Sequence, residues 1–315
     1  MRALWDWAKG IVLNGLLIAV IAHGLIGISL VWDKVLLQRR ETQNLLSYVF
    51  WLGAISIFGL LLAPFGFHFP QWQYGAIGFA AGVLDLIASY FYYSALKAGE
   101  ASEELAAMGG FTPVATALIA IPLLKSPIGG DIAGFSLMVT GGFIMFFAEK
   151  TPLRKMLPRV IMASGCFGLT TVLQKIVFDH EQFVTGFVFF TLGTFAGSVA
   201  LLVPPSWRRQ ILEHSGKATP RSKFWYMVNR FLAGVGSFLV TFAVSRTSPA
   251  LVTAISGVRY AVIFIGAYLI TMWKPEWFRE DFRKWVLTAK VVATCLVAAG
   301  LAVVGIHGKA GGSAP

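Results

Sequence analysis

Three ionisable side chains lie deep within long apolar segments of the 315-residue sequence: His23, Asp85 and Arg259. A charge near the centre of a bilayer costs about 2.5–3.5 kcal/mol, so intramembrane charges generally have a function or a buried partner. Arg259 offers a rigid fork of hydrogen-bond donors to an anionic group. Asp85 or His23 could carry a proton, because burial changes the proton affinity of such groups.

Two other interpretations of these residues stay open. Asp85 and Arg259 could form a buried salt bridge that locks two helices together, since intramembrane charges commonly pair. His23 could be a neutral imidazole that is hydrogen-bonded inside a helical bundle. The salt bridge and the substrate site are compatible if a substrate competes with Asp85 for Arg259.

Lys34 and Lys175 each lie near the end of an apolar segment, and they occupy matching positions in two similar halves of the sequence. Such lysines can snorkel, which means that the apolar stem stays in the membrane while the ammonium group reaches the interface. The alternative is a symmetric pair of basic residues that gate a pathway or bind headgroups. Both interpretations stay open.

Glu103 and Glu104 begin another apolar segment, and Tyr260 follows Arg259 directly. All three are further substrate-binding candidates, although carboxylates also stabilise a helix N-terminus. Cys166 and Cys295 lie in apolar runs without the spacing of a metal site or a redox motif. No motif of a hydrolase, metalloprotease or nucleotide-binding loop occurs, so we expect no enzyme, no cofactor and no metal.

The elements that position these residues are membrane helices. The chain is 57% hydrophobic and 13% charged, with a mean hydropathy of +0.71, whereas soluble domains are about 25% charged. A membrane-crossing helix needs about 20 mostly apolar residues. This criterion predicts an all-α membrane protein with ten spans: 11–32, 44–63, 74–96, 101–124, 130–148, 157–178, 185–203, 225–245, 250–273 and 285–306.

The net charge of +11 is unevenly distributed over the loops between these spans. Of the 26 Lys and Arg residues, 18 lie on the side of the loops that follow the odd-numbered spans. Cytoplasmic loops carry such an excess, so basic loops explain the charge without a nucleic-acid partner. The bias predicts a cell (inner) membrane protein with both termini outside the cytoplasm.

Two halves of the sequence resemble each other. Residues 22–27 recur as residues 163–168, and Ala-Gly-Val at 81–83 recurs at 233–235. These and other matches follow in the same order on equivalent spans, which indicates duplication of a five-helix unit.

The two units are predicted at residues 1–152 and 153–315. Because five is odd, the second unit must enter the membrane from the opposite side, which makes the repeats inverted. Secondary transporters commonly have this architecture, with the substrate site near the membrane midplane. Two small-residue motifs, Gly78-x-x-x-Gly82 and Gly193-x-x-x-Gly197, further predict close helix packing.

The segments Tyr-Tyr-Ser-Ala-Leu-Lys-Ala-Gly-Glu-Ala-Ser at 92–102 and Gly-Phe-Thr-Pro-Val at 110–114 resemble the EamA repeat of the drug/metabolite transporter superfamily. The resemblance implies an inverted five-plus-five bundle with a central cavity lined mainly by spans 1, 3, 4, 6, 8 and 9. The superfamily includes exporters of amino acids and drugs, nucleotide-sugar exchangers and proposed lipid-carrier flippases.

The leading hypothesis is a secondary carrier of a small polar or anionic metabolite, with possible proton coupling and alternating access. Alternatives are a flippase for a phosphate-bearing lipid carrier, a drug-type cation exporter, and a non-transporting membrane interaction protein. The expected partners are a small-molecule or lipid-linked substrate and the membrane lipids.

Overall fold

The computed structural model of the chain describes residues 2–38, 44–98, 101–125, 132–148, 153–217, 219–273 and 284–310. Within these ranges the side chains of some helical residues are also outside the description. Among them are the candidates Glu103 and Glu104 in α4 and Tyr260 in α11, which are therefore placed only by their helices.

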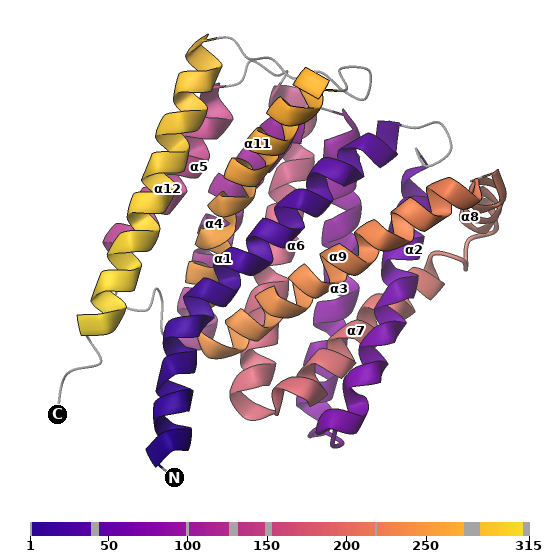
Figure 1. The fold of residues 1–315 in the computed structure, drawn as a ribbon. Helices are drawn as coiled ribbons and strands as arrows, with labels where there is room; N and C mark the ends of the chain where they lie inside the picture. The colour runs from indigo at the N-terminus through magenta and orange to yellow at the C-terminus, as the bar shows by residue number, and fades with distance from the viewer. Residues whose placement is uncertain are drawn as a thin grey trace.

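Every regular element in the described ranges is a helix (Figure 1). The elements are α1 (Arg2–Gln38), α2 (Leu45–Ile55), the 3₁₀ helix η1 (Ser56–Phe65), α3 (Trp72–Ala98), α4 (Ala101–Leu124), α5 (Ile132–Ala148), α6 (Leu153–His180), α7 (Phe183–Ala200), α8 (Pro205–Lys217), α9 (Pro220–Arg246), α10 (Pro249–Ala254), the 3₁₀ helix η2 (Ile255–Gly257), α11 (Val258–Trp273) and α12 (Lys284–Ala310).

The described part of the chain contains seven helical segments that are long and apolar enough to cross a membrane. They correspond to the predicted spans 1–3 and 6–9, and they show a multi-pass helical membrane protein. The other three predicted spans coincide with α4, α5 and α12, whose described apolar stretches are shorter: 110–124, 132–144 and 291–300. That these three also cross the membrane stays a prediction.

The helices form a bundle in which sequence neighbours are often not spatial neighbours. α3 packs along α6 and α7, α1 packs along α9, and α4 packs against α5 and α6. α12 lies beside α5 at one edge of the bundle, while α2, α7 and α8 form the other edge (Figure 1). Helices that carry candidate residues of the first half therefore pack against helices that carry candidate residues of the second half.

The close helix packing predicted from the glycine motifs is confirmed where α3 crosses α7. A Cβ atom added at Gly82 would overlap the Phe190 carbonyl oxygen, and one at Gly193 would overlap the Phe79 carbonyl oxygen. The Thr194 hydroxyl also donates to the Gly82 carbonyl at 3.1 Å. Only a residue without a side chain allows the two backbones to approach in this way.

Two predictions of regular structure are wrong in detail. The segment 204–224 was expected to be a loop, but it contains the amphipathic helix α8, whose Ile211 is fully buried while Arg208 and Arg209 are exposed. Span 250–273 was expected to be continuous. It breaks into α10, η2 and α11, and the break contains the Ser256-Gly257 pair, a common cause of helix kinks.

Candidate functional site

His23 and Arg259, which are 236 positions apart in the sequence, form a direct hydrogen bond in the bundle interior. Arg259 Nε donates to His23 Nδ1 at 2.8 Å. His23 Nε2 lies 2.8 Å from the Val252 carbonyl oxygen, which can only accept. The imidazole therefore accepts at one nitrogen and donates at the other, and this pattern describes a neutral ring.

The broken helix of span 9 explains how these groups meet. Val252 belongs to α10 and Arg259 to the first turn of α11, with η2 between them. Short 3₁₀ turns within a membrane helix often mark hinges or functional sites. His23 of α1 is only 1% exposed. Its two ring nitrogens bond to residues on both sides of the break, so it connects the break to α1 and orients the Arg259 side chain.

Asp85 faces the interior of the bundle from α3. The residues one and two turns away on the same helix face are all buried: Gly78, Ala81, Gly82, Ala88, Ser89 and Tyr92. Asp85 itself is half-buried. Tyr92 on this face contacts Phe167 of α6, and Gly82 on the same face meets Phe190 of α7, so the face packs against both helices.

The salt bridge between Asp85 and Arg259, an alternative raised by the sequence, is not formed. Within the described part of the chain, Asp85 has no ion pair, and Arg259 Nε is engaged by His23. Ser164, which aligns with His23 in the proposed repeat, instead accepts a hydrogen bond from Thr112 of α4 at 3.1 Å. The matched positions thus have different surroundings.

The two matched lysines also differ. Lys34 is 7% exposed and donates to the Leu96 carbonyl oxygen at 2.8 Å, so its ammonium group has a partner inside the bundle. Lys175 forms an ion pair of 2.6 Å with Asp179, one turn further along α6. The structure therefore does not make them an equivalent pair, and a gating role for either stays a prediction.

A second cluster of buried charges was missed by the sequence analysis. Arg230 of α9 forms an ion pair with Asp33 of α1. Tyr48 and Asn229 each donate to Asp33 Oδ1 at 2.5 Å, and Tyr93 donates to Oδ2 at 3.0 Å. Four helices, α1, α2, α3 and α9, are joined at this single carboxylate.

Aromatic rings surround the guanidinium group of Arg230. Its Cζ atom lies 5.4 Å, 5.8 Å and 5.5 Å from the ring centroids of Tyr48, Tyr93 and Tyr226. Cations over aromatic faces are stabilised by the ring quadrupole, more strongly when water is excluded. The cluster is thus both charge-paired and enclosed.

The sequence positions of Asp33 and Arg230 did not reveal whether these charges are buried or reach the interface. Asp33 directly follows the predicted span 11–32, and Arg230 is the sixth residue of span 225–245. Charges at such places usually reach the interface, and the loop-charge count treats Arg230 and Lys34 as loop residues. The structure buries both, which weakens the charge bias behind the predicted orientation.

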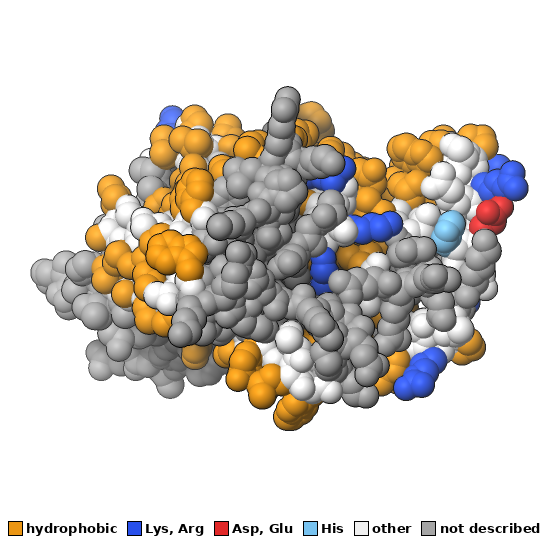
Figure 2. All heavy atoms as spheres, turned by 90° about the horizontal axis from the view of Figure 1, so that it is seen from above, with side chains coloured by type: hydrophobic (Ala, Val, Ile, Leu, Met, Phe, Trp, Pro, Cys, Tyr) orange, Lys and Arg blue, Asp and Glu red, His pale blue; other side chains and the backbone are white. Residues whose placement is uncertain are grey.

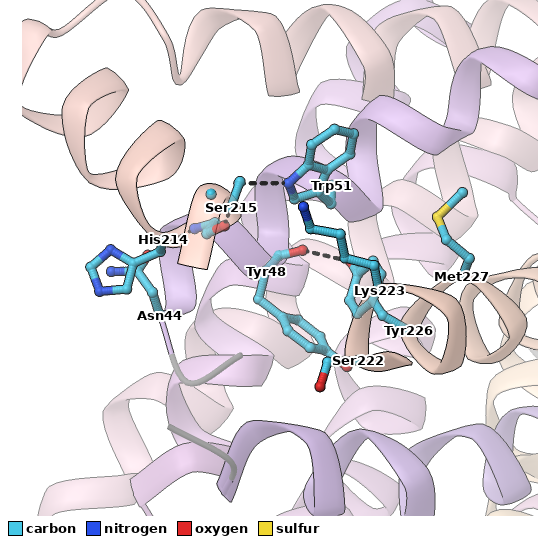
Figure 3. Close-up of a pocket in the computed structure, with 11 residues that line it drawn as sticks. Asn44, Tyr48, Trp51, His214, Ser215, Ser222, Lys223, Tyr226 and Met227 are labelled. Atoms are coloured by element: carbon cyan, nitrogen blue, oxygen red, sulfur yellow. Dashed lines mark hydrogen bonds between the residues drawn. The ribbon is translucent and has the colours of Figure 1, made fainter. Parts of the chain in front are cut away.

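A cavity of about 410 Å³ lies beside this cluster, between α2, α8 and α9. Its lining residues are Asn44, Ser47, Tyr48, Trp51, His214, Ser215, Gly216, Ser222, Lys223, Tyr226 and Met227 (Figure 3). Tyr226 donates to the Tyr48 carbonyl oxygen at 2.9 Å and thereby separates the cavity from the Asp33–Arg230 pair. Figure 2 shows this end of the bundle from above, with Lys and Arg side chains at several places on the face and acidic colour confined to one edge.

Comparison with known proteins supports the fold but names no family. No family model and no curated protein matches the chain. A solved structure, described only as "Crystal structure of protein", is similar with a TM-score of 0.62 and 17% sequence identity over 92% of this chain and 95% of that chain. This helix arrangement therefore occurs in a solved protein. Membership of the EamA family stays a prediction.

Proposed function

We propose that the chain is a secondary transporter that moves a small polar or anionic metabolite across the membrane by alternating access. The observation that carries this proposal is Arg259, a half-buried cation at a break in a membrane helix, positioned by the neutral His23. Broken helices at mid-membrane depth are recurrent substrate sites of transporters. A guanidinium group there suits an anionic substrate.

The packing of equivalent helices supports the proposed ten-span inverted repeat. In this scheme α1 and α6 are equivalent, as are α3 and α9, and α4 and the broken span α10–α11. The pairs α1–α9 and α6–α3 both pack along each other, and so do α1–α11 and α6–α4. Such interleaving of two units allows them to rock against each other around a central site.

The substitution Arg259→Gln tests the anion site. We expect binding of the transported anion to weaken by about 10–100-fold, because a hydrogen bond to a charged group contributes about 1.5–3 kcal/mol. The measurement is thermal unfolding of the purified protein against a panel of carboxylates, phosphates, cations and zwitterions, followed by uptake into proteoliposomes. Arg246→Gln is the control, since the Arg246 guanidinium group lies over the Phe242 ring at the end of α9.

An anion that stabilises the wild type and Arg246→Gln but not Arg259→Gln would support the proposal. Equal stabilisation of all three proteins would remove Arg259 from the binding site. Stabilisation by cations alone would contradict an anionic substrate and favour a drug-type exporter.

Asp85 is the proposed proton-coupling residue, because it is the half-buried carboxyl group on an otherwise buried face of α3. In Asp85→Asn we expect uptake to lose its dependence on an imposed pH gradient, while exchange of labelled for unlabelled substrate continues. An amide keeps the shape of the side chain but cannot carry the proton. Gradient-driven uptake at the wild-type rate in this variant would exclude the role, and Ser89→Ala on the same face serves as the control.

A further inference from the structure

The lining of the cavity between α2, α8 and α9 has a smaller polar part and a larger apolar part. The polar part contains Lys223, His214 and hydroxyl and amide groups, and among the described residues no acidic side chain lines it. The apolar part includes Trp51 and Met227, which are 42% and 45% exposed. A site with this division suits an amphiphile whose polar end is anionic.

Among the described residues that line the cavity, Lys223 carries the charge. Figure 3 shows its side chain extending toward Trp51 and Ser215. Within the described part of the chain, its ammonium group forms no ion pair or hydrogen bond with another residue. Lys223 also lies in the first turn of α9, where the helix dipole favours an anion.

The neighbouring hydroxyl groups are already ordered. Trp51 Nε1 donates to Ser215 Oγ at 2.8 Å, and Ser215 Oγ donates to the Ile211 carbonyl oxygen at 2.6 Å. Ser47 Oγ lies 3.1 Å from Ser215 Oγ. This chain of hydrogen bonds links α2 to α8 and holds one wall of the cavity in place beside Lys223.

The surroundings of the cavity suit a position at the edge of the membrane. α8 is amphipathic, with Ile211 buried and basic residues exposed, as in helices that lie in the interfacial plane. Below it, the outer surface of α9 exposes Phe224, Met227, Val228 and Phe231. Because Met227 lines the cavity and also belongs to this surface, the apolar part of the cavity borders a surface suited to acyl chains.

From these observations we infer that the cavity binds the headgroup of an anionic phospholipid, with the phosphate at Lys223 and an acyl chain along Trp51 and Met227. Its volume of about 410 Å³ is within the range of small-molecule sites, about 300–1,000 Å³. The lipid would bridge α2, α8 and α9. Because Tyr48 and Tyr226 form the wall shared with the Asp33–Arg230 pair, bound lipid would also stabilise that cluster.

The test compares dioleoyl phosphatidylglycerol with dioleoyl phosphatidylcholine, added to the delipidated, detergent-purified full-length protein. Binding is measured by native mass spectrometry and by the midpoint of thermal unfolding. We expect phosphatidylglycerol to bind selectively to the wild type. Lys223→Gln should bind it about tenfold more weakly, as expected for loss of one charge-assisted contact, while the control Arg221→Gln should bind normally. Arg221 is an exposed basic residue of the same helix turn that does not line the cavity.

A second variant keeps the charge and fills the space. At Gly216, on the rim of the cavity, an added Cβ atom would meet no atom within 4 Å, so Gly216→Phe should fold and block the lipid. Equal losses in Lys223→Gln and Arg221→Gln, or equal binding of both lipids, would overturn the inference in favour of diffuse attraction. Competition by glycerol phosphate or inorganic phosphate at the same concentrations would overturn the lipid in favour of a soluble phosphate ligand. The site is independent of Arg259, so either proposal can fail alone.

Discussion

Replacing Arg230 with Met is expected to lower the free energy of unfolding by about 3–5 kcal/mol. The substitution removes the cation from a pair in which the Asp33 side chain is 0% exposed and the Arg230 side chain is 4% exposed. A buried carboxylate without its counter-charge is costly. The donors Tyr48 and Tyr93 remain, but hydrogen bonds from neutral groups do not replace the missing positive charge.

A double-mutant cycle distinguishes loss of the pair from loss of packing. In Asp33→Asn combined with Arg230→Met neither charge remains, and the Asn side-chain oxygen can still accept from Tyr48. We expect the double variant to be more stable than the sum of the two single effects implies, by about 1–3 kcal/mol. The measurement is chemical unfolding in detergent, followed by tryptophan fluorescence.

The control is Arg209→Gln, which breaks an ion pair with Glu213 on the exposed surface of α8. Exposed pairs contribute little, so this variant should unfold like the wild type. If Arg230→Met were as stable as Arg209→Gln, the buried pair would not hold the four helices together. Additive effects in the cycle would show that the two charges act independently.

The second large effect is expected at the crossing of α3 and α7. In Gly82→Ala the new Cβ atom would overlap the Phe190 carbonyl oxygen and lie 2.6 Å from the Thr194 amide nitrogen. Both are backbone atoms, so no side-chain rotation relieves the clash and the helices must separate. We expect a loss of about 3 kcal/mol in the free energy of unfolding, at the upper end for overpacking, measured by the same unfolding assay.

Gly234→Ala is the matched control. Gly234 occupies the position that corresponds to Gly82 in the sequence repeat, within the same Ala-Gly-Val triplet, yet a Cβ atom there would meet nothing within 4 Å. Because Ala has the better helix propensity, this variant should be as stable as the wild type or slightly more so. Equal destabilisation of both variants would mean that the α3–α7 contact is no tighter than the surroundings of α9.

Single residues were easier to predict than their partners. His23, Asp85 and Arg259 stand out because an ionisable group in an apolar run is rare. Their pairing does not stand out: the sequence suggested Asp85 with Arg259, whereas Arg259 binds His23 across 236 positions. Asp33 and Arg230 were missed because a charge near the end of an apolar run looks the same whether it reaches the interface or turns inward.

Three further candidate site residues stay predictions. Glu103, Glu104 and Tyr260 are placed in α4 and α11, and their side chains lie outside the described residues. Their roles in substrate binding therefore remain as the sequence analysis stated them.

The sequence by itself determined that this is a multi-pass helical membrane protein, because the cost of placing a segment in lipid is largely a sum over its own residues. It also determined where helices can approach closely, since the absence of a side chain is a local property. Only the tertiary structure decided that Gly82 is enclosed by α7 while Gly234 is open, that Asp33 pairs with Arg230, and that α8 borders a cavity. These outcomes depend on which helix faces meet, and that choice is made by packing between segments distant in the sequence.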